Sequence, residues 1–99
     1  MGVAVEIRVK EIRLLQGHKS TRAFVDLEIG GITVRDFRVC QTNGKPSVRN
    51  PFTSYKDREG ILGFKEIISF PVTVQTEINA RILNDYFHRV KESRNVKHS

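Results

Sequence analysis

Nucleophilic and acid–base side chains are few in this sequence and widely separated. The single cysteine is Cys40, and the histidines are His18, His88 and His98. A cysteine nucleophile needs a neighbouring base or cation that activates its thiol, and the spacing supplies no such partner. We interpret Cys40 as a small apolar residue and expect no catalytic residue, no metal ligands and no cofactor.

Cationic residues are concentrated in two stretches. Residues 35–58 contain six cationic and two acidic residues, which gives this stretch a net charge of +4. Residues 81–99 contain five cationic and two acidic residues, which gives a net charge of +3. The whole chain carries +6, so the remainder is slightly acidic. Clustered Lys and Arg neutralise phosphates and release counterions, and Arg adds bidentate hydrogen bonds. The charge pattern therefore favours a polyanionic partner: nucleic acid, an anionic membrane or an acidic protein.

Specific side chains follow from this charge pattern. We expect phosphate contacts from six cations: Arg49, Lys56, Arg58, Arg81, Arg89 and Lys91. Phe52 and Tyr55 lie within the first basic stretch, where aromatic rings could stack on unpaired bases. The alternative is a solvated charged surface on which Phe52 only anchors its loop. The nucleic-acid prediction depends on cations from the separate stretches meeting in one patch of the folded chain.

The first half of the chain predicts an antiparallel meander. Apolar residues alternate with polar ones over residues 3–10 and 22–29, as half-buried strands require. Gly30-Gly31 predicts a tight hairpin into a third strand, residues 32–40, because primed turns need positive φ. Short connections of this kind favour antiparallel pairing.

Changes of phase and turn residues add detail to this meander. The alternation slips near Lys10-Glu11, which indicates a bulge or a bend. It slips again near Arg35-Asp36, where the alternatives are a bulge and a strand that is apolar on both faces. Asn43-Gly44 predicts another tight turn, into a short edge strand over residues 45–49 that contains a proline. Residues 50–60 are rich in Pro, Ser, Asp and Gly and predict an exposed loop.

The second half predicts a fifth strand over residues 61–70 and then a helix capped by Thr73. Apolar residues recur at three- and four-residue steps, which is typical of an amphipathic helix of about five turns: Val74, Ile78, Ile82, Leu83, Tyr86, Phe87 and Val90. The predicted fold class is α+β: an antiparallel meander of about five strands and one C-terminal amphipathic helix, in two layers. We expect one domain over residues 1–92 and a basic tail over 93–99.

Size and composition agree with a small intracellular domain. With 99 residues the chain is one domain long, and a single cysteine excludes an internal disulfide. No apolar run approaches the ~18 residues of a membrane span, and the first residues do not resemble a signal peptide. We therefore expect a cytoplasmic protein. Exposed sheet edges predict a two-fold homodimer.

The order of the motifs resembles the stage V sporulation protein G family, also called septation regulators. The likeness lies in residues 5–9 (VEIRV), 22–27 (RAFVDL) and 32–39 (ITVRDFRV), in the turn pairs Asn43-Gly44 and Asn50-Pro51, and in the segment 64–71 with the helix. The tail departs from many members because it is basic rather than acidic.

The resemblance implies a small dimeric α+β protein of the bacterial cytoplasm that binds DNA, and in some members RNA. It implies roles in gene expression, septum formation and sporulation, with residues 50–60 and the C-terminal helix as contact elements. A rival function is a non-catalytic protein-interaction module that recruits an acidic cell-division partner.

Overall fold

The structure is a computed structural model that describes residues 5–17 and 20–97, with side chains up to Ser93. Predictions for residues 3–4 and for His18 and His98 lie outside the described residues. The elements, in chain order, are β1 (Ile7–Leu14), β2 (Thr21–Ile29), β3 (Ile32–Thr42), β4 (Lys45–Arg49), β5 (Phe52–Lys56), β6 (Leu62–Glu66) and α1 (Val72–Lys97).

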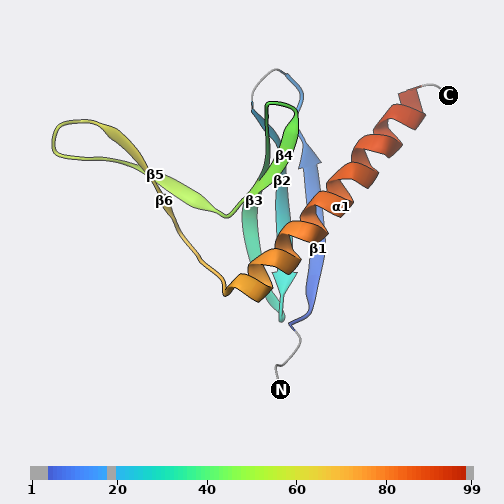
Figure 1. The fold of residues 1–99 in the computed structure, drawn as a ribbon, viewed down its shortest axis with the longest axis horizontal. Coiled ribbons are helices and arrows are strands. Elements are labelled where there is room, and N and C mark those ends of the chain that lie inside the picture. The colour runs from blue at the N-terminus through green and yellow to red at the C-terminus, as the bar shows by residue number, and fades with distance from the viewer. Residues whose placement is uncertain (1–4, 18–19, 98–99) are drawn as a thin grey trace.

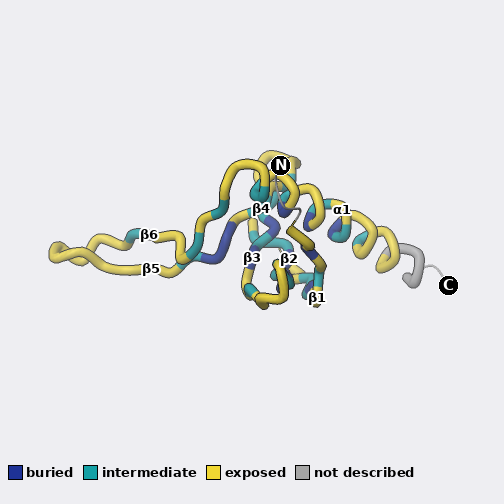
Figure 2. The backbone as a smooth tube through the Cα atoms, turned by 90° about the horizontal axis from the view of Figure 1, so that it is seen from below, coloured by how far each residue is buried: buried dark blue, intermediate teal, exposed yellow. Residues whose placement is uncertain are grey.

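The strands form two antiparallel sheets, and the fold class is α+β as predicted. β1 to β4 make a four-stranded sheet in sequence order, and β5 pairs only with β6. α1 crosses one face of the larger sheet (Figure 1), and the sheet and helix form two layers (Figure 2). The β5–β6 hairpin with its turn, residues 52–66, projects away from both layers. We call this hairpin the arm.

The arm corrects two sequence predictions. The exposed loop expected over residues 50–60 is wrong, because Phe52–Lys56 is strand β5. The fifth strand expected over residues 61–70 is shorter, Leu62–Glu66, and pairs with β5 instead of joining the meander. The Asp57 carboxylate accepts the backbone N–H groups of Glu59 and Ile61, each at 2.9 Å, and these bonds close the turn that brings the strands together.

Both predicted β-bulges are present. The β1–β2 register shifts between Val9 and Glu11, and the β2–β3 register shifts between Val25 and Leu27, opposite Arg35-Asp36. Asp36 adopts a φ of 69°. The second bulge keeps Val34 and Phe37 on the inner face of β3, which excludes a strand that is apolar on both faces.

The two predicted hairpin turns have left-handed backbones at both central residues. The φ values are 55° and 85° at Gly30 and Gly31, and 55° and 79° at Asn43 and Gly44. These values match type I′ turns, whose twist suits antiparallel strands.

Gly31→Ala tests the first of these turns. We expect it to lower the free energy of unfolding by about 1 kcal/mol, because alanine is strained at positive φ. Chemical denaturation measures the change, with Gly31→Asn as the control that tolerates the left-handed region. Equal stability of both variants and the wild type would contradict the strain argument.

The core lies between α1 and the inner sheet face. Its fully buried side chains are Ala23, Val25, Leu27, Phe37, Val39, Ile78 and Ile82. The predicted helical stripe is confirmed for Ile78, Ile82 and Tyr86, but Phe87 is 54% exposed. Phe87 follows Tyr86 by one residue, about 100° around the helix, which turns it away from the sheet.

The ends of α1 differ from the prediction. Thr73 is not the N-cap, because the helix begins at Val72 and the Pro71 carbonyl accepts the Gln75 N–H at 2.8 Å. The helix continues to Lys97, so the expected tail is helical over residues 93–97. Within the described residues, α1 is too polar to be a candidate membrane-spanning helix.

Candidate nucleic-acid interface

The six predicted phosphate contacts do not form one cluster in a single chain. Lys56 and Arg58 lie at the tip of the arm, whereas Arg81, Arg89 and Lys91 lie on α1. The arm tip and the C-terminal end of α1 occupy opposite ends of the molecule (Figure 1), which extends 54 Å along its longest axis. The two basic stretches therefore do not converge among the residues whose side chains the structure describes.

The arm itself is electrically balanced. Three cations and three acids alternate along it, all exposed: Lys56, Arg58, Lys65, Asp57, Glu59 and Glu66. Each cation therefore has an acid within a few residues, and the repulsion of a polyanion by the acids offsets the attraction by the cations. The arm alone does not form a phosphate-binding patch.

Strand register creates a different basic surface, on the sheet face opposite α1. We call this surface the open face. Arg13 of β1 lies opposite Phe24 of β2, Phe24 lies opposite Arg38 of β3, and Arg38 lies opposite Arg49 of β4. Directly opposed residues share a sheet face, so these four side chains form a row across all four strands. Of these four, only Arg49 belongs to the predicted set.

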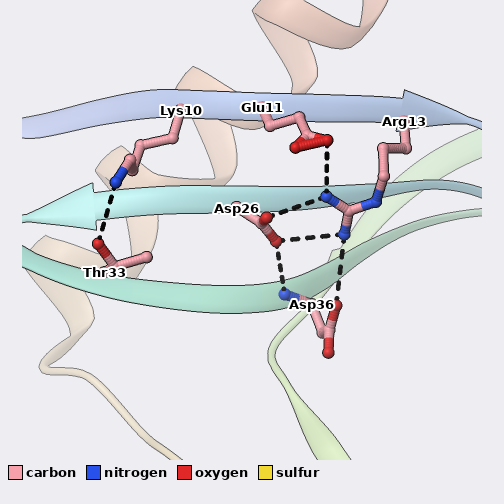
Figure 3. Close-up of polar contacts among 6 residues, drawn as sticks. All are labelled: Lys10, Glu11, Arg13, Asp26, Thr33 and Asp36. Carbon is pink, nitrogen blue, oxygen red and sulfur yellow. Dashed lines mark hydrogen bonds and ion pairs between the residues drawn. The ribbon is translucent and has the colours of Figure 1, made fainter.

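The acidic groups near this row are held by Arg13, as Figure 3 shows. Its guanidinium donates two hydrogen bonds to the Asp26 carboxylate, at 2.9 and 3.2 Å, and contacts Glu11 at 3.3 Å and Asp36 at 3.4 Å. The Asp26 carboxylate also accepts the Asp36 N–H at 3.1 Å. This bond holds the β3 bulge against β2, so that Arg35 and Asp36 lie at the surface.

Asp26 is 8% exposed and remains ionised because of these contacts. The hydrogen bonds from Arg13 lower the pKa of the Asp26 carboxyl, and the Asp36 N–H lowers it further, against the opposing effect of desolvation. The same carboxylate raises the pKa of Arg13. Further along the sheet, Glu28 is paired with Arg8 at 3.5 Å. Arg8 thus balances Glu28, whereas the single charge of Arg13 is shared among three carboxylates, so this network keeps an excess of negative charge.

Three arginines of β3 and β4 have no acidic partner in the part of the chain that the structure describes. Within the described residues, no acidic group lies within 4.0 Å of the side-chain nitrogens of Arg35, Arg38 or Arg49. Arg38 and Arg49 oppose each other directly, and like charges in that position repel. An anion bound between them would remove that repulsion.

Aromatic rings flank the middle arginine of the row. The Arg38 guanidinium carbon lies 5.0 Å from the centre of the Phe24 ring and 4.3 Å from that of Phe52. A shallow pocket of about 460 Å³ opens beside this stack, and its lining includes Arg35, Arg38 and Ile67. The root of the arm therefore forms one wall of a basic and aromatic corner on the open face.

The two predicted stacking residues have different surroundings. Phe52 is half-buried, between Arg38 and an edge-to-face contact with Phe64 at 5.6 Å. Tyr55 is 51% exposed, and its ring lies over Gly63, where an added Cβ would approach it to 2.6 Å. Phe52 thus anchors the arm and also completes the basic corner, while Tyr55 covers a glycine on the other face of the arm.

Sequence reasoning missed Arg35, Arg38 and Phe24 as candidate binding residues. Arg35 and Arg38 counted towards the charge of the first basic stretch but were not singled out, and Phe24 was placed only in a strand. The available signal was their position: Phe24 and Arg38 fall out of phase with the apolar core residues of β2 and β3, so both must face away from the helix.

The isolated nucleophilic and basic side chains stay apart. Cys40 is half-buried in β3, and His88 is exposed on α1 in the other layer. In the described part of the chain, no three His, Cys, Asp or Glu side chains are grouped so that they could hold a metal ion.

No family model and no curated protein matches this chain. The likeness to the stage V sporulation protein G family stays a prediction.

Proposed function

We propose that this chain is a non-enzymatic, nucleic-acid-binding regulatory protein of the bacterial cytoplasm, and that its open face contacts the phosphate backbone. The observation that carries the proposal is the pair Arg38 and Arg49, opposed across two strands without acidic partners. Arg35 adds a third cation from the bulge beside them. The resemblance to septation regulators implies the same class of partner and a role in gene expression or cell division.

The chemistry of this corner suits a nucleic acid strand. Guanidinium groups bind phosphate oxygens in bidentate geometry, and each neutralised phosphate releases counterions. Phe24 and Phe52 hold the Arg38 guanidinium between them, which limits the rotamer freedom that binding must otherwise remove. DNA is the first candidate ligand and RNA the second.

The test is a titration of labelled oligonucleotides at several salt concentrations with the double variant Arg35→Ala/Arg49→Ala. Both side chains are exposed, so we expect the variant to fold. Loss of two phosphate contacts should weaken binding about tenfold or more and reduce the slope of log K against log salt by ~1.4 for a single strand or ~1.8 for a duplex. Single-stranded and duplex DNA and RNA of one sequence are compared.

Two matched variants remove the same charge elsewhere. Arg81→Ala/Arg89→Ala removes two cations from α1, and Lys56→Ala/Arg58→Ala removes two cations from the tip of the arm. We expect either variant to change the slope of log K against log salt much less. If all three double variants reduce affinity equally, binding follows net charge alone and the open-face assignment is wrong. If the wild type binds nucleic acid only with ordinary non-specific affinity, about 10⁻⁴–10⁻⁶ M, the protein-interaction alternative is favoured.

A further inference from the structure

A cleft of about 550 Å³ lies at the root of the arm. Three parts of the chain line it: the end of β4 with Asn50, the two arm strands, and the segment from Ser69 to Asn79 that includes the start of α1. Phe52 lines this cleft and also the pocket beside Arg38, so the cleft adjoins the basic corner of the open face. Its volume is in the range of sites that bind small organic groups, roughly 300–1,000 Å³.

One wall of the cleft is aromatic and partly uncovered. Phe52, Phe64 and Phe70 contribute to it. Phe64 is 61% exposed, and its aromatic contact is the edge-to-face one with Phe52, at 5.6 Å between centroids. Much of the Phe64 ring is therefore available to a planar ligand. Stacking of a nucleobase on such a ring strengthens binding by roughly 5- to 150-fold, and it tolerates any base because each has a π-face.

Another wall presents side-chain amides that are held in fixed orientations. The Asn50 and Gln75 amides exchange two hydrogen bonds, at 2.7 and 2.9 Å, and Asn50 is 7% exposed. Gln75 Nε2 donates its other hydrogen bond, at 2.9 Å, to Asn79 Oδ1. Among the described residues Asn79 Nδ2 has no acceptor, so the network ends in a donor at the lining of the cleft. Asn and Gln amides of this kind bind the edges of nucleobases.

The charged residues of the lining place a phosphate site next to the aromatic and amide walls. Arg49 belongs to the row of the open face and also lines the cleft. Lys65 adds a second cation and Glu66 one acid, so the lining carries a net charge of +1. A strand with one phosphate on Arg49 therefore has the cleft beside that phosphate. One nucleotide needs this arrangement, a cation for its charge and a separate contact for its base.

We propose that the cleft binds an unpaired nucleobase of the strand whose phosphates lie on the open face. The base stacks on Phe64, and its edge accepts a hydrogen bond from Asn79 Nδ2. This inference rests on the proposed function and narrows its ligand to single-stranded nucleic acid, because a base within a duplex would have to leave the stack before it could enter the cleft. Neither Phe64 nor Asn79 was among the binding residues expected from the sequence.

The experiment compares three DNA ligands of one length by fluorescence anisotropy at several salt concentrations. They are an intact single strand, the same strand with abasic sites in place of its bases, and the duplex. The wild type should bind the intact strand at least ~5-fold more tightly than the abasic strand, and more tightly than the duplex. The salt slopes of the two single strands should agree, since both present the same phosphates. An RNA strand of the same sequence shows which sugar is preferred.

A variant assigns this preference to the cleft. Phe64→Ala removes the stacking ring, and the preference for the intact strand over the abasic strand should fall below ~2-fold. The matched control is Phe87→Ala, because Phe87 is exposed to a similar extent, 54%, but lies on α1. This control should keep the preference. The comparison of the two strands with the wild type does not depend on any variant folding.

The base site and the phosphate site fail in different ways. Equal affinity of the wild type for the intact and abasic strands overturns the base site, and so does tighter binding of the duplex. A preference that Phe64→Ala leaves unchanged also overturns it. None of these results affects the proposed function, which depends on the salt slope of Arg35→Ala/Arg49→Ala. If that slope equals the wild-type slope while Phe64→Ala abolishes the preference, the open-face assignment fails and the base site stands.

Discussion

Asp26→Ala should lower the free energy of unfolding by about 2–4 kcal/mol, because it leaves a guanidinium and a backbone N–H without their buried acceptor. Asp26 is 8% exposed and accepts three hydrogen bonds, two from Arg13 and one from the Asp36 N–H. Urea denaturation followed by circular dichroism measures the loss.

The control for this variant is the removal of an exposed ion pair on the same face of the sheet. Arg8→Ala removes a 3.5 Å contact to Glu28 from a side chain that is 65% exposed, and we expect it to change stability by less than about 0.5 kcal/mol. If Asp26→Ala costs no more than Arg8→Ala, the network around Asp26 does not stabilise the sheet.

Acid titration gives the same residue a second test. The pKa of Asp26 is lower in the folded chain than in the unfolded one, so its ionised form favours folding. This contribution is complete above the unfolded pKa of about 3.9 and is lost as the pH falls through the folded pKa. The stability difference between wild type and Asp26→Asn should therefore shrink as the pH is lowered below about 4. A difference independent of pH would show that the charge is not the cause.

Local patterns predicted the four-stranded sheet well, because its determinants are short-range. Alternating apolar residues set the inner face of β1 and β2, and Gly30-Gly31 and Asn43-Gly44 allow positive φ where each turn needs it. The slips of phase marked both bulges. The pattern did not show why the second bulge forms, since the Asp26 carboxylate that holds it lies ten residues away on β2.

The arm was not predicted as a hairpin, because its strands do not alternate cleanly and only the second of them was expected, over residues 61–70. β5 and β6 have no helix to face, so no buried side selects apolar residues at every second position. A short polar segment such as Phe52–Lys56 then resembles a loop. What identifies it as a strand is its pairing with Leu62–Glu66, which depends on the turn at Asp57.

The candidate site was only partly predictable for a similar reason. Counting charges along the chain grouped Arg49 with Lys56 and Arg58. Arg49 lies beside the root of the projecting arm, whereas Lys56 and Arg58 lie at its tip. The structure instead places Arg49 opposite Arg38, a contact set by strand register. Register also brings Phe24 into the row. Neighbours across strands decide which cations act together, and one-dimensional composition does not contain that information.

Phe37→Ala should lower the free energy of unfolding at least as much as Asp26→Ala. It should also loosen the segment that joins the arm to α1. Phe37 is fully buried on β3, opposite Val25, and its truncation should lower the free energy of unfolding by about 3–5 kcal/mol. Its ring also stacks on Phe70, with 6.1 Å between centroids and 24° between planes. Because Phe70 lies between the arm and α1, losing this contact should also speed hydrogen exchange over residues 67–71.

Two comparisons separate these effects. Phe37→Leu retains much of the buried volume and should cost only ~1–2 kcal/mol. Phe87→Ala removes the same kind of ring from an exposed position on α1 and should change stability by less than about 0.5 kcal/mol. If exchange over residues 67–71 in Phe37→Ala rises no more than in the rest of the sheet, the variant only lowers global stability. The root of the arm would then be held by the amide contacts of Asn50 with Gln75, at 2.7 and 2.9 Å, rather than by the stacked rings.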